Sequence, residues 1–273
     1  MENEKRNLNS FYKNKKGQVT IFIIIAVLVV VAGVLIYMFF PGFQTPSEKA
    51  DLEDPQRYIQ DCVSDEMKEV VQQVSLQGGS LEPEASYQYQ GREIEYSCYS
   101  DEYYEFCSVQ IPFLRDHVEK EIKSGISGQV ENCFSSLEEE YEKEGFNLNI
   151  QNREMDVRLL PESIVANLNK TINLRKGETS EKHENFKISL NNNLYQRVNV
   201  AESIVEFESS YGSADSSMYM NMYHNLLVYK KEQSDETTIY IIEDVNTGNK
   251  FQFASRSLAF PPGYGEPPER LRE

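Results

Sequence analysis

The feature that most constrains this chain is an uncharged apolar run near its N-terminus. Residues 18–40 read QVTIFIIIAVLVVVAGVLIYMFF, and most of them are Ile, Leu, Val or Phe. As a helix they extend about 35 Å, enough to cross a hydrocarbon core of roughly 30 Å. A run this long and uniform predicts a transmembrane helix. A buried core helix and the shorter apolar segment of a secretory signal peptide fit it less well.

The charges on either side of this run predict its orientation. Residues 1–17 carry five basic and two acidic side chains, whereas acidic residues prevail over the stretch 48–54. Because positive charge favours the cytoplasmic side, we expect the C-terminal part to be extracytoplasmic. The chain is then a single-pass protein of the cell membrane, with the lipid bilayer as a partner. We expect a cytoplasmic basic leader (1–17), a transmembrane helix (18–40) and a stalk (41–53).

The junction before the apolar run resembles a known processing signal. Lys15-Lys16-Gly17-Gln18-Val19-Thr20 resembles the class III signal of archaeal pilin-like proteins, which a prepilin-type peptidase cuts after the Gly. The resemblance implies that peptidase as a partner and a cut between Gly17 and Gln18, with the helix kept on the mature protein. Many pilins carry Glu at the fifth mature position to pair with a neighbour's free amine, but this chain has Phe22. A buried amine without a carboxylate is costly, so we expect a simple anchor, cut or uncut, in preference to a close-packed filament subunit.

Beyond the stalk, the apolar periodicity predicts an α+β ectodomain of two or three helices packed on an antiparallel β-sheet meander. A first helix begins with Asp54 as N-cap and Pro55 at its first position, and it ends at Gly78-Gly79. We expect a second helix over about 112–145 and a third over about 192–210. Alternating apolar residues predict the strands. These cover 146–150, 155–159, 164–168, 172–174 and 186–190, followed by a hairpin over 239–253.

These patterns divide the outer part into three segments. Residues 54–145 read as a helical subdomain that contains the Cys and Tyr residues, with an irregular, Tyr-rich stretch at 80–110. Residues 146–260 read as an antiparallel sheet plus a helix. Residues 261–273 are rich in Pro and Gly, which predicts an extended tail.

A second resemblance extends over most of residues 15–256. It rests on the order of four features: Gln77-Gly78-Gly79 after a Cys-bearing helix, the helix with Cys133, the strand meander and the ending Phe251-Gln252-Phe253-Ala254-Ser255-Arg256. In this order the chain resembles a group of uncharacterised archaeal membrane-anchored surface proteins with a pilin-like N-terminal segment. The resemblance implies a cell-surface protein and carries no activity with it.

All four Cys lie in the part predicted to be extracytoplasmic, where an even number favours two disulfides. Three pairings are possible. A local bridge between Cys98 and Cys107 is compatible with their short spacing, and a bridge between Cys62 and Cys133 would join two helices. Four free thiols are the alternative. No Cys-x-x-Cys pair is present, so we do not expect a zinc site.

The charge and the motifs exclude several functions. A net charge of −17 argues against a nucleic-acid partner. Common nucleotide-binding, hydrolase and metalloprotease motifs are absent, so we expect no enzyme, no cofactor and no metal. His117 and Glu121 are predicted to form a solvated helical pair rather than to hold a metal. Asp244, Asn246 and Gly248 resemble part of a calcium loop, but a hairpin turn explains the same residues.

A structural or interaction role is therefore expected, as a pilin-like component of the cell envelope or a surface appendage. The alternatives are a tethered extracellular hydrolase, using acids such as Glu119 or Asp156 in a cleft, and a solute-binding or sensor domain. Asn169-Lys170-Thr171 is a candidate glycosylation site. Tyrosines bring contact area with a polar tip, which suits glycan or protein surfaces, and six form the candidate contact surface. They are Tyr87, Tyr89, Tyr96, Tyr99, Tyr103 and Tyr104.

Processing of the leader is testable on the native protein. Intact-mass measurement of the chain from its own membranes should give a mature protein that begins at Gln18. A mass that includes residues 1–17 would contradict the pilin pathway and leave a simple anchor.

Overall fold

The computed structural model describes Val27, residues 54–151 and residues 154–259. The predicted leader, stalk and tail lie outside these residues, as do Gly17, Gln18 and all of the predicted transmembrane helix except Val27, which is helical. Within the described residues, no helix combines the length and apolar character that a membrane crossing needs. The chain divides into two units between Lys49 and Ala50, and the second is described here by itself.

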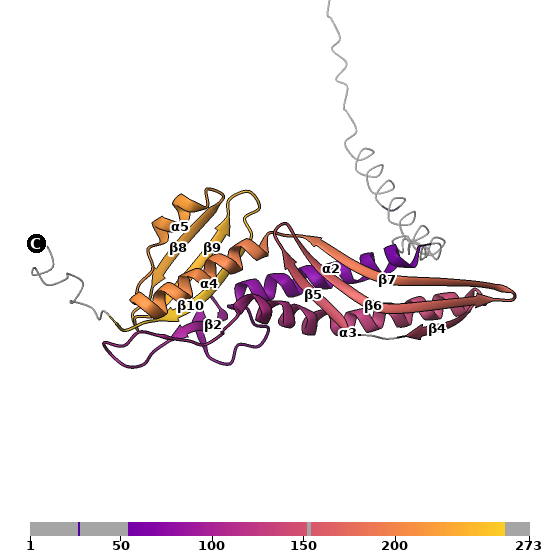
Figure 1. Ribbon diagram of the computed structural model, residues 1–273, viewed down its shortest axis with the longest axis horizontal. Coiled ribbons are helices and arrows are strands. Elements are labelled where there is room, and N and C mark those ends of the chain that lie inside the picture. Colours follow the sequence, from indigo (N-terminus) through magenta and orange to yellow (C-terminus); the bar gives the residue numbers. More distant parts are fainter. Residues whose placement is uncertain (1–26, 28–53, 152–153, 260–273) are drawn as a thin grey trace, which may run out of the picture. The chain divides into compact units, whose positions relative to one another are not determined.

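This second unit is α+β, as the sequence predicts (Figure 1). Its strands form two sheets instead of the single meander that we expected. The elements, in chain order, are α2 (Pro55–Leu76), β1 (Ser86–Tyr89), β2 (Arg92–Tyr99), β3 (Ser108–Val109), α3 (Leu114–Lys143), β4 (Asn147–Gln151), β5 (Met155–Leu160), β6 (Ser163–Lys176), β7 (Thr179–Asn191), α4 (Leu194–Tyr211), α5 (Ser216–Met222), β8 (Leu226–Glu232), β9 (Thr238–Asp244) and β10 (Lys250–Arg256).

The first sheet is a long antiparallel ribbon on which α2 and α3 pack (Figure 1). Strand β6 forms its centre, because β7 pairs along one edge of β6 while β5 and β4 pair with the two halves of the other edge. The predicted strands 164–168 and 172–174 are therefore one strand, with an irregularity between Leu168 and Thr171. The apolar stripes of both helices are buried against this sheet in the main core.

A glycine sets how closely the two helices approach. A Cβ at Gly125 would lie 2.7 Å from Cγ1 of Val70 on α2, nearer than packed side chains allow. Any larger residue would push the helices apart. Helix α3 passes through Gly125 and Gly128 without a break.

Two disulfides are present, as the even number of Cys favoured, and they follow one of the three pairings that the sequence left open. Cys62–Cys133 joins α2 to α3 across 71 residues of sequence. Cys98–Cys107 closes a loop across nine residues between β2 and β3. The first bond fixes the helix pair, and the second fixes the loop that follows β2.

The prediction of an irregular stretch at 80–110 is wrong, because three strands lie there. Strand β2 pairs antiparallel with β1 and β3 and parallel with β10, so it joins the ranges 54–145 and 146–260 in one sheet. This strand is not evident from the sequence, because the charged residues Arg92, Glu93 and Glu95 interrupt the apolar alternation that predicts a strand. Glu95 is nevertheless buried, and it lies so near Gly78 that a Cβ there would meet the Glu95 backbone at 2.9 Å.

The second sheet has the order β1-β2-β10-β9-β8, with β3 on β2. The predicted hairpin of β9 and β10 and the third helix, α4, are confirmed. Strand β8 and helix α5 have no counterpart among the predicted elements. Helix α4 contacts both sheets, and its N-terminus lies where they adjoin (Figure 1).

The two disulfides should contribute unequally to stability. Replacing Cys62 and Cys133 by Ser opens a long loop in the unfolded chain and should lower the free energy of unfolding by roughly 4 kcal/mol. The matched pair Cys98→Ser and Cys107→Ser opens a short loop and should cost roughly 2.5 kcal/mol. Urea unfolding followed by tyrosine fluorescence measures both. A larger loss for the short loop would contradict this order.

Candidate functional site

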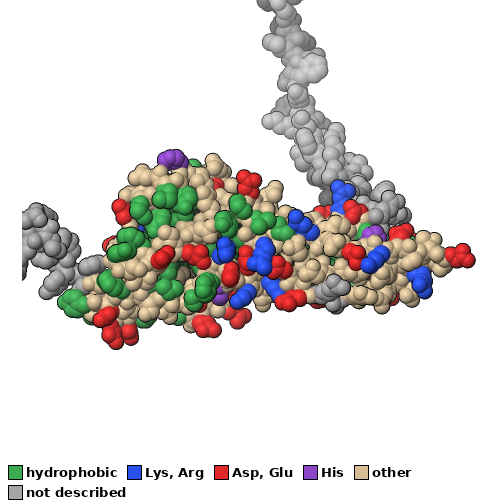
Figure 2. All heavy atoms as spheres, viewed as in Figure 1, with side chains coloured by type: hydrophobic (Ala, Val, Ile, Leu, Met, Phe, Trp, Pro, Cys, Tyr) green, Lys and Arg blue, Asp and Glu red, His purple; other side chains and the backbone are tan. Residues whose placement is uncertain are grey.

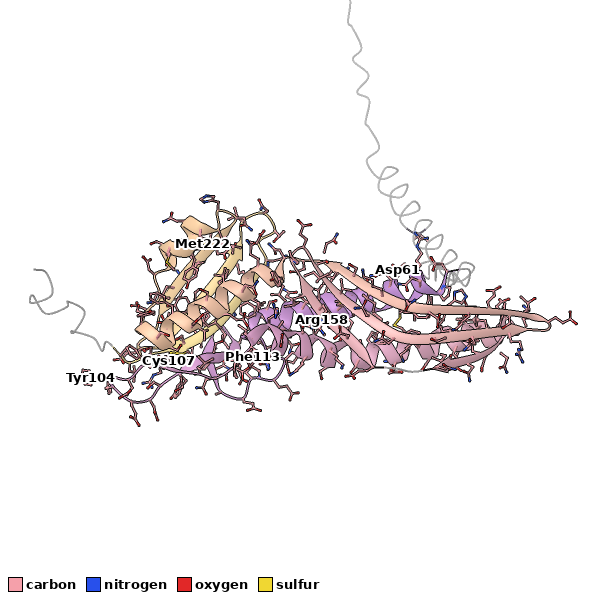
Figure 3. All side chains as sticks on the ribbon, viewed as in Figure 1. Asp61, Tyr104, Cys107, Phe113, Arg158 and Met222 are labelled. Carbon is pink, nitrogen blue, oxygen red and sulfur yellow. A yellow bond between two sulfur atoms is a disulfide. The ribbon has the colours of Figure 1, made fainter. Side chains whose placement is uncertain are left out.

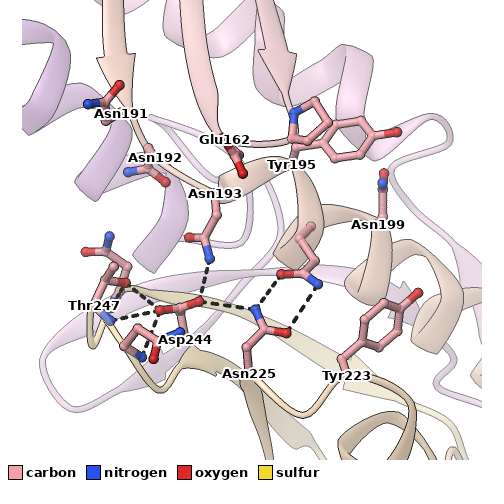
Figure 4. A pocket seen from close by; sticks show the side chains of 14 residues that line it. Glu162, Asn191, Asn192, Asn193, Tyr195, Asn199, Tyr223, Asn225, Asp244 and Thr247 are labelled. Carbon is pink, nitrogen blue, oxygen red and sulfur yellow. Dashed lines mark hydrogen bonds between the residues drawn. The ribbon is translucent and has the colours of Figure 1, made fainter.

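The candidate site is an open pocket of about 710 Å³ between the end of β7, the start of α4 and the turn that joins β9 to β10 (Figure 4). Side-chain amides dominate its lining, and it contains two tyrosines and two carboxylates but no lysine, arginine or histidine. We call it the amide pocket. Its lining residues are Pro161, Glu162, Asn191, Asn192, Asn193, Tyr195, Gln196, Asn199, Tyr223, Asn225, Asp244, Asn246, Thr247 and Asn249.

Asp244, at the end of β9, organises the base of this pocket. It is buried, with only 2% of its surface exposed. Its Oδ1 accepts hydrogen bonds from the backbone N–H groups of Asn246 and Thr247 and from the Thr247 hydroxyl, at 2.8–3.0 Å. Its Oδ2 accepts from the side-chain amides of Asn193 and Asn225 (Figure 4). The carboxylate therefore holds three separate segments of the pocket wall in place.

These hydrogen bonds keep Asp244 ionised. Burial alone would raise the pKa of Asp244, but the hydrogen bonds from Thr247, Asn193 and Asn225 outweigh burial and hold its pKa below the ordinary value of 3.8. A carboxylate with a lowered pKa is a poor proton donor near neutral pH. It serves this pocket as a fixed acceptor.

Two further amides are held in a reciprocal pair. Asn225 donates to Oε1 of Gln196 at 2.8 Å, and Gln196 donates back to Oδ1 of Asn225 at 3.4 Å (Figure 4). Gln196 lies in the first turn of α4, and Asn225 directly precedes β8. The pair therefore fixes the start of the helix against the start of the strand.

Other polar groups of the pocket remain open to a ligand. The side-chain amides of Asn191, Asn199 and Asn246 hydrogen-bond to no other residue in the part of the chain that the structure describes, and neither do the hydroxyls of Tyr195 and Tyr223. Tyr195 and Asn199 are four residues apart on α4, so they share one face of the helix. With Tyr223 they lie along one side of the pocket (Figure 4).

The chemistry of this lining is that of polar recognition. Each free amide offers a carbonyl acceptor and an NH₂ donor, which matches hydroxyl groups that both donate and accept. The tyrosine rings offer apolar faces beside these polar groups. The carboxylates of the lining are Asp244, which is fully engaged, and Glu162, which is exposed on the β5–β6 turn.

The acids named for a hydrolase take up a different arrangement. Arg158 forms ion pairs with both Asp156 at 2.9 Å and Glu119 at 3.5 Å, and Glu119 also accepts the backbone N–H of Leu159 at 2.8 Å. Burial raises the pKa of Glu119, against these favourable contacts. Neither acid lines the amide pocket. The contacts tie α3 to β5.

Four of the six predicted contact tyrosines cover a small core on the second sheet. Tyr87, Tyr89 and Tyr99 pack around Ile94, Ile239 and Ala254. Tyr96 is buried there, its hydroxyl lies 2.9 Å from that of Thr237, and burial raises its pKa. These rings are chiefly structural.

Tyr103 and Tyr104 remain as exposed rings, at 57% and 65%. Both lie with Phe106 in the loop between β2 and β3 that Cys98–Cys107 closes, and Tyr104 lies at the end of the unit away from the β6–β7 hairpin (Figure 3). Figure 2 shows hydrophobic side chains gathered over this half of the unit and charged side chains over the half that holds the long sheet.

His117 and Glu121 both hold the turn after α2, each with its own partner. His117 Nε2 lies 2.8 Å from the Ser80 hydroxyl, and Glu121 accepts the backbone N–H of Leu81 at 2.8 Å. Over the described ranges 54–151 and 154–259, no group of three or more His, Cys, Asp or Glu side chains is placed to hold a metal ion.

Asn169, the predicted glycosylation site, is exposed at the irregularity in β6. Its side-chain NH₂ donates to the backbone carbonyl of Glu154 at 2.7 Å. A glycan attached at this nitrogen would replace one of its two hydrogens and leave the other for this hydrogen bond.

Of the asparagines that line the pocket, the sequence singles out only Asn246, and only as part of a hairpin turn with Asp244. The run Asn191-Asn192-Asn193 between a strand and a helix was the available signal. Asparagine runs are typical of turns, so this run predicts a loop between two secondary-structure elements and not a ligand-binding site. The fold then brings to it Asn225 and Asn246, which are distant in sequence.

The role of Asp244 predicts a pH-dependent contribution to stability. Because its pKa is lower in the folded state than the ordinary 3.8, its contribution is fully present above that value and is lost as the pH falls below it. Asp244→Asn should lower the free energy of unfolding by about 2 kcal/mol at pH 7 and by less at pH 3. Urea unfolding at the two pH values measures this.

Asp235 provides the matched control, because it accepts similar hydrogen bonds from Thr237 in an exposed hairpin turn. Asp235→Asn should cost under about 1 kcal/mol. Equal losses for the two variants, or a loss at Asp244 that does not change with pH, would contradict a buried ionised carboxylate.

Known proteins provide no template for this site. No protein-family model, no curated protein and no solved structure matches the chain. The function is therefore inferred from the residues of the pocket and from the sequence around it.

Proposed function

We propose that the protein is a single-pass, membrane-anchored, extracytoplasmic binding protein whose amide pocket takes the uncharged, hydroxyl-bearing part of a carbohydrate. The observation that carries the proposal is the lining of this pocket, in which free asparagine amides and two tyrosines surround a fully hydrogen-bonded carboxylate. The proposal combines the expected interaction role at the cell surface with the solute-binding alternative.

Carbohydrate suits this lining better than other neutral ligands. A sugar ring carries adjacent hydroxyls that both donate and accept, and an asparagine amide can satisfy two of them at once. The C–H faces of the ring pack on aromatic side chains, a role open to Tyr195 and Tyr223. An apolar ligand would leave several amides without partners, at a cost of about 1–3 kcal/mol for each buried group.

The location rests on two supports. The apolar run at 18–40 and the basic leader before it favour an anchor with a cytoplasmic N-terminus. All four Cys form disulfides, which persist in oxidising, extracytoplasmic surroundings. The class III signal at Lys15–Thr20 would send the chain through the prepilin-type peptidase, so a role within a pilin-like envelope structure is part of the same proposal.

Binding is favoured over hydrolysis because, among the described residues that line the pocket, Glu162 is the only carboxylate that is not engaged in side-chain hydrogen bonds. Glycoside hydrolysis needs one carboxyl group that gives up a proton and a second that acts as nucleophile or base. The lowered pKa of Asp244 and its five hydrogen bonds disqualify it for the first role. The exposed Glu162 is the other carboxylate of the lining, and one carboxylate does not supply the pair that glycoside hydrolysis needs.

Asn199 offers a clean test of the pocket. Its amide has no partner among the described residues and lies within α4, so Asn199→Ala should preserve the fold and favour the helix slightly. It should weaken binding of the best ligand in a panel of neutral oligosaccharides about tenfold. Isothermal titration of the full chain in nanodiscs measures this.

Asn132→Ala is the matched control, because Asn132 is an exposed asparagine on helix α3, away from the pocket. Its affinity should equal that of the unaltered chain. If none of the oligosaccharides binds, or if Asn199→Ala binds as tightly as Asn132→Ala, the amide pocket is not the carbohydrate site.

A further inference from the structure

A second pocket, of about 530 Å³, adjoins the amide pocket and differs from it in charge. Residues of α2, the end of β7, α4 and the start of β10 line it. Its charged lining residues are all cationic, although the chain as a whole has 44 acidic and 27 basic residues. We call it the basic pocket, after Lys68, Arg197 and Lys250. It shares Asn191, Asn192 and Asn249 with the amide pocket.

Arg197 supplies a fixed positive charge beside this pocket. The side chain is buried, with 1% of its surface exposed, and its two terminal nitrogens donate to the amide oxygens of Asn193 and Asn192. Its Nε–H has no hydrogen-bond partner in the described part of the chain. Burial lowers the pKa of Arg197 to about 10, so the guanidinium remains charged at neutral pH. A buried charge with an unsatisfied donor favours an anion nearby.

The charge of Arg197 is compensated only at a distance. Asn193 separates it from Asp244, because the amide accepts from Arg197 and donates to Asp244. Among the described residues no carboxylate forms an ion pair with Arg197. The positive potential of the guanidinium therefore remains available to a ligand in the basic pocket.

The two lysines are available to a ligand as well. Lys68 pairs with Asp65 at 2.7 Å and Lys250 with Glu243 at 3.4 Å, but both lysine side chains are about half exposed, at 57% and 45%. Neither acidic partner lines the pocket. Exposed ion pairs contribute little, so an anion that also meets Arg197 can replace these partners.

We propose that the basic pocket binds the carboxylate or sulfate group of an acidic carbohydrate whose neutral part occupies the amide pocket. The shared asparagines place the two pockets within reach of one oligosaccharide. The inference rests on the proposed function and narrows its ligand class to acidic glycans. Amides in both pockets meet the hydroxyls, and the three cations select the charge.

The test compares acidic oligosaccharides with their neutral counterparts on the full chain in nanodiscs. The probes are tetragalacturonate with its methyl ester, and a sulfated chitotetraose with its unsulfated parent. Isothermal titration should give an affinity about tenfold higher for the acidic member of at least one pair. A preference within the galacturonate pair indicates that the pocket binds a carboxylate, and a preference within the chitotetraose pair indicates that it binds a sulfate.

Two double variants locate the preference. Lys68→Met with Lys250→Met should reduce the advantage of the acidic member severalfold, because, of the described lining cations, only Arg197 then remains to attract its charge. Lys182→Met with Lys231→Met removes the same charge from exposed lysines outside both pockets and should keep that advantage. A circular dichroism spectrum and an unfolding curve for each variant verify that the fold is retained.

The outcomes separate this inference from the proposed function. Equal binding of acidic and neutral members, with both weakened by Asn199→Ala, overturns the acidic preference and leaves the carbohydrate site intact. Acidic binding that Asn199→Ala does not weaken overturns the single ligand across both pockets. Absence of binding by every probe contradicts the inference and the proposed function together.

Discussion

The buried carboxylate of Asp244 is the interaction on which the candidate site depends. It gathers donors from the β9–β10 turn, from Asn193 before α4 and from Asn225 before β8. Three chain segments that are separate in sequence are thereby fixed around one charge. Asn193 extends this arrangement to Arg197, so two buried opposite charges are held apart by an amide. Such a network is costly when incomplete and rigid when complete.

The rest of the fold forms a rigid scaffold for the hydrogen bonds around Asp244. The helix pair α2 and α3 packs closely at Gly125, and Cys62–Cys133 joins it. The long sheet and the second sheet each bury an apolar face, and α4 contacts both. The main apolar core continues through α4 into the second sheet, and polar groups beside the start of α4 form the two pockets. A rigid scaffold that presents fixed amides suits recognition of a polar ligand, because few groups must be ordered on binding.

Much of the fold could be predicted from the sequence, because its signals are local. Asp54, Pro55 and Gly78 mark the ends of α2, and strict alternation reveals most of the long sheet. Strand β2 could not be found this way, because buried Glu95 and its charged neighbours break the pattern and its partner β10 is far along the chain. The pocket could not be predicted from the sequence for a similar reason. Its asparagines favour turns locally, and only the tertiary fold gathers them around Asp244.

The most direct test of the account is a nuclear magnetic resonance titration of the asparagine side chains. With a bound neutral oligosaccharide, the side-chain NH₂ signals of Asn191, Asn199 and Asn246 should shift, while that of Asn132 on the outer face of α3 should stay in place. Shifts spread evenly over the asparagines of the chain, or confined to residues outside the amide pocket, would contradict the claim that this pocket is the binding site.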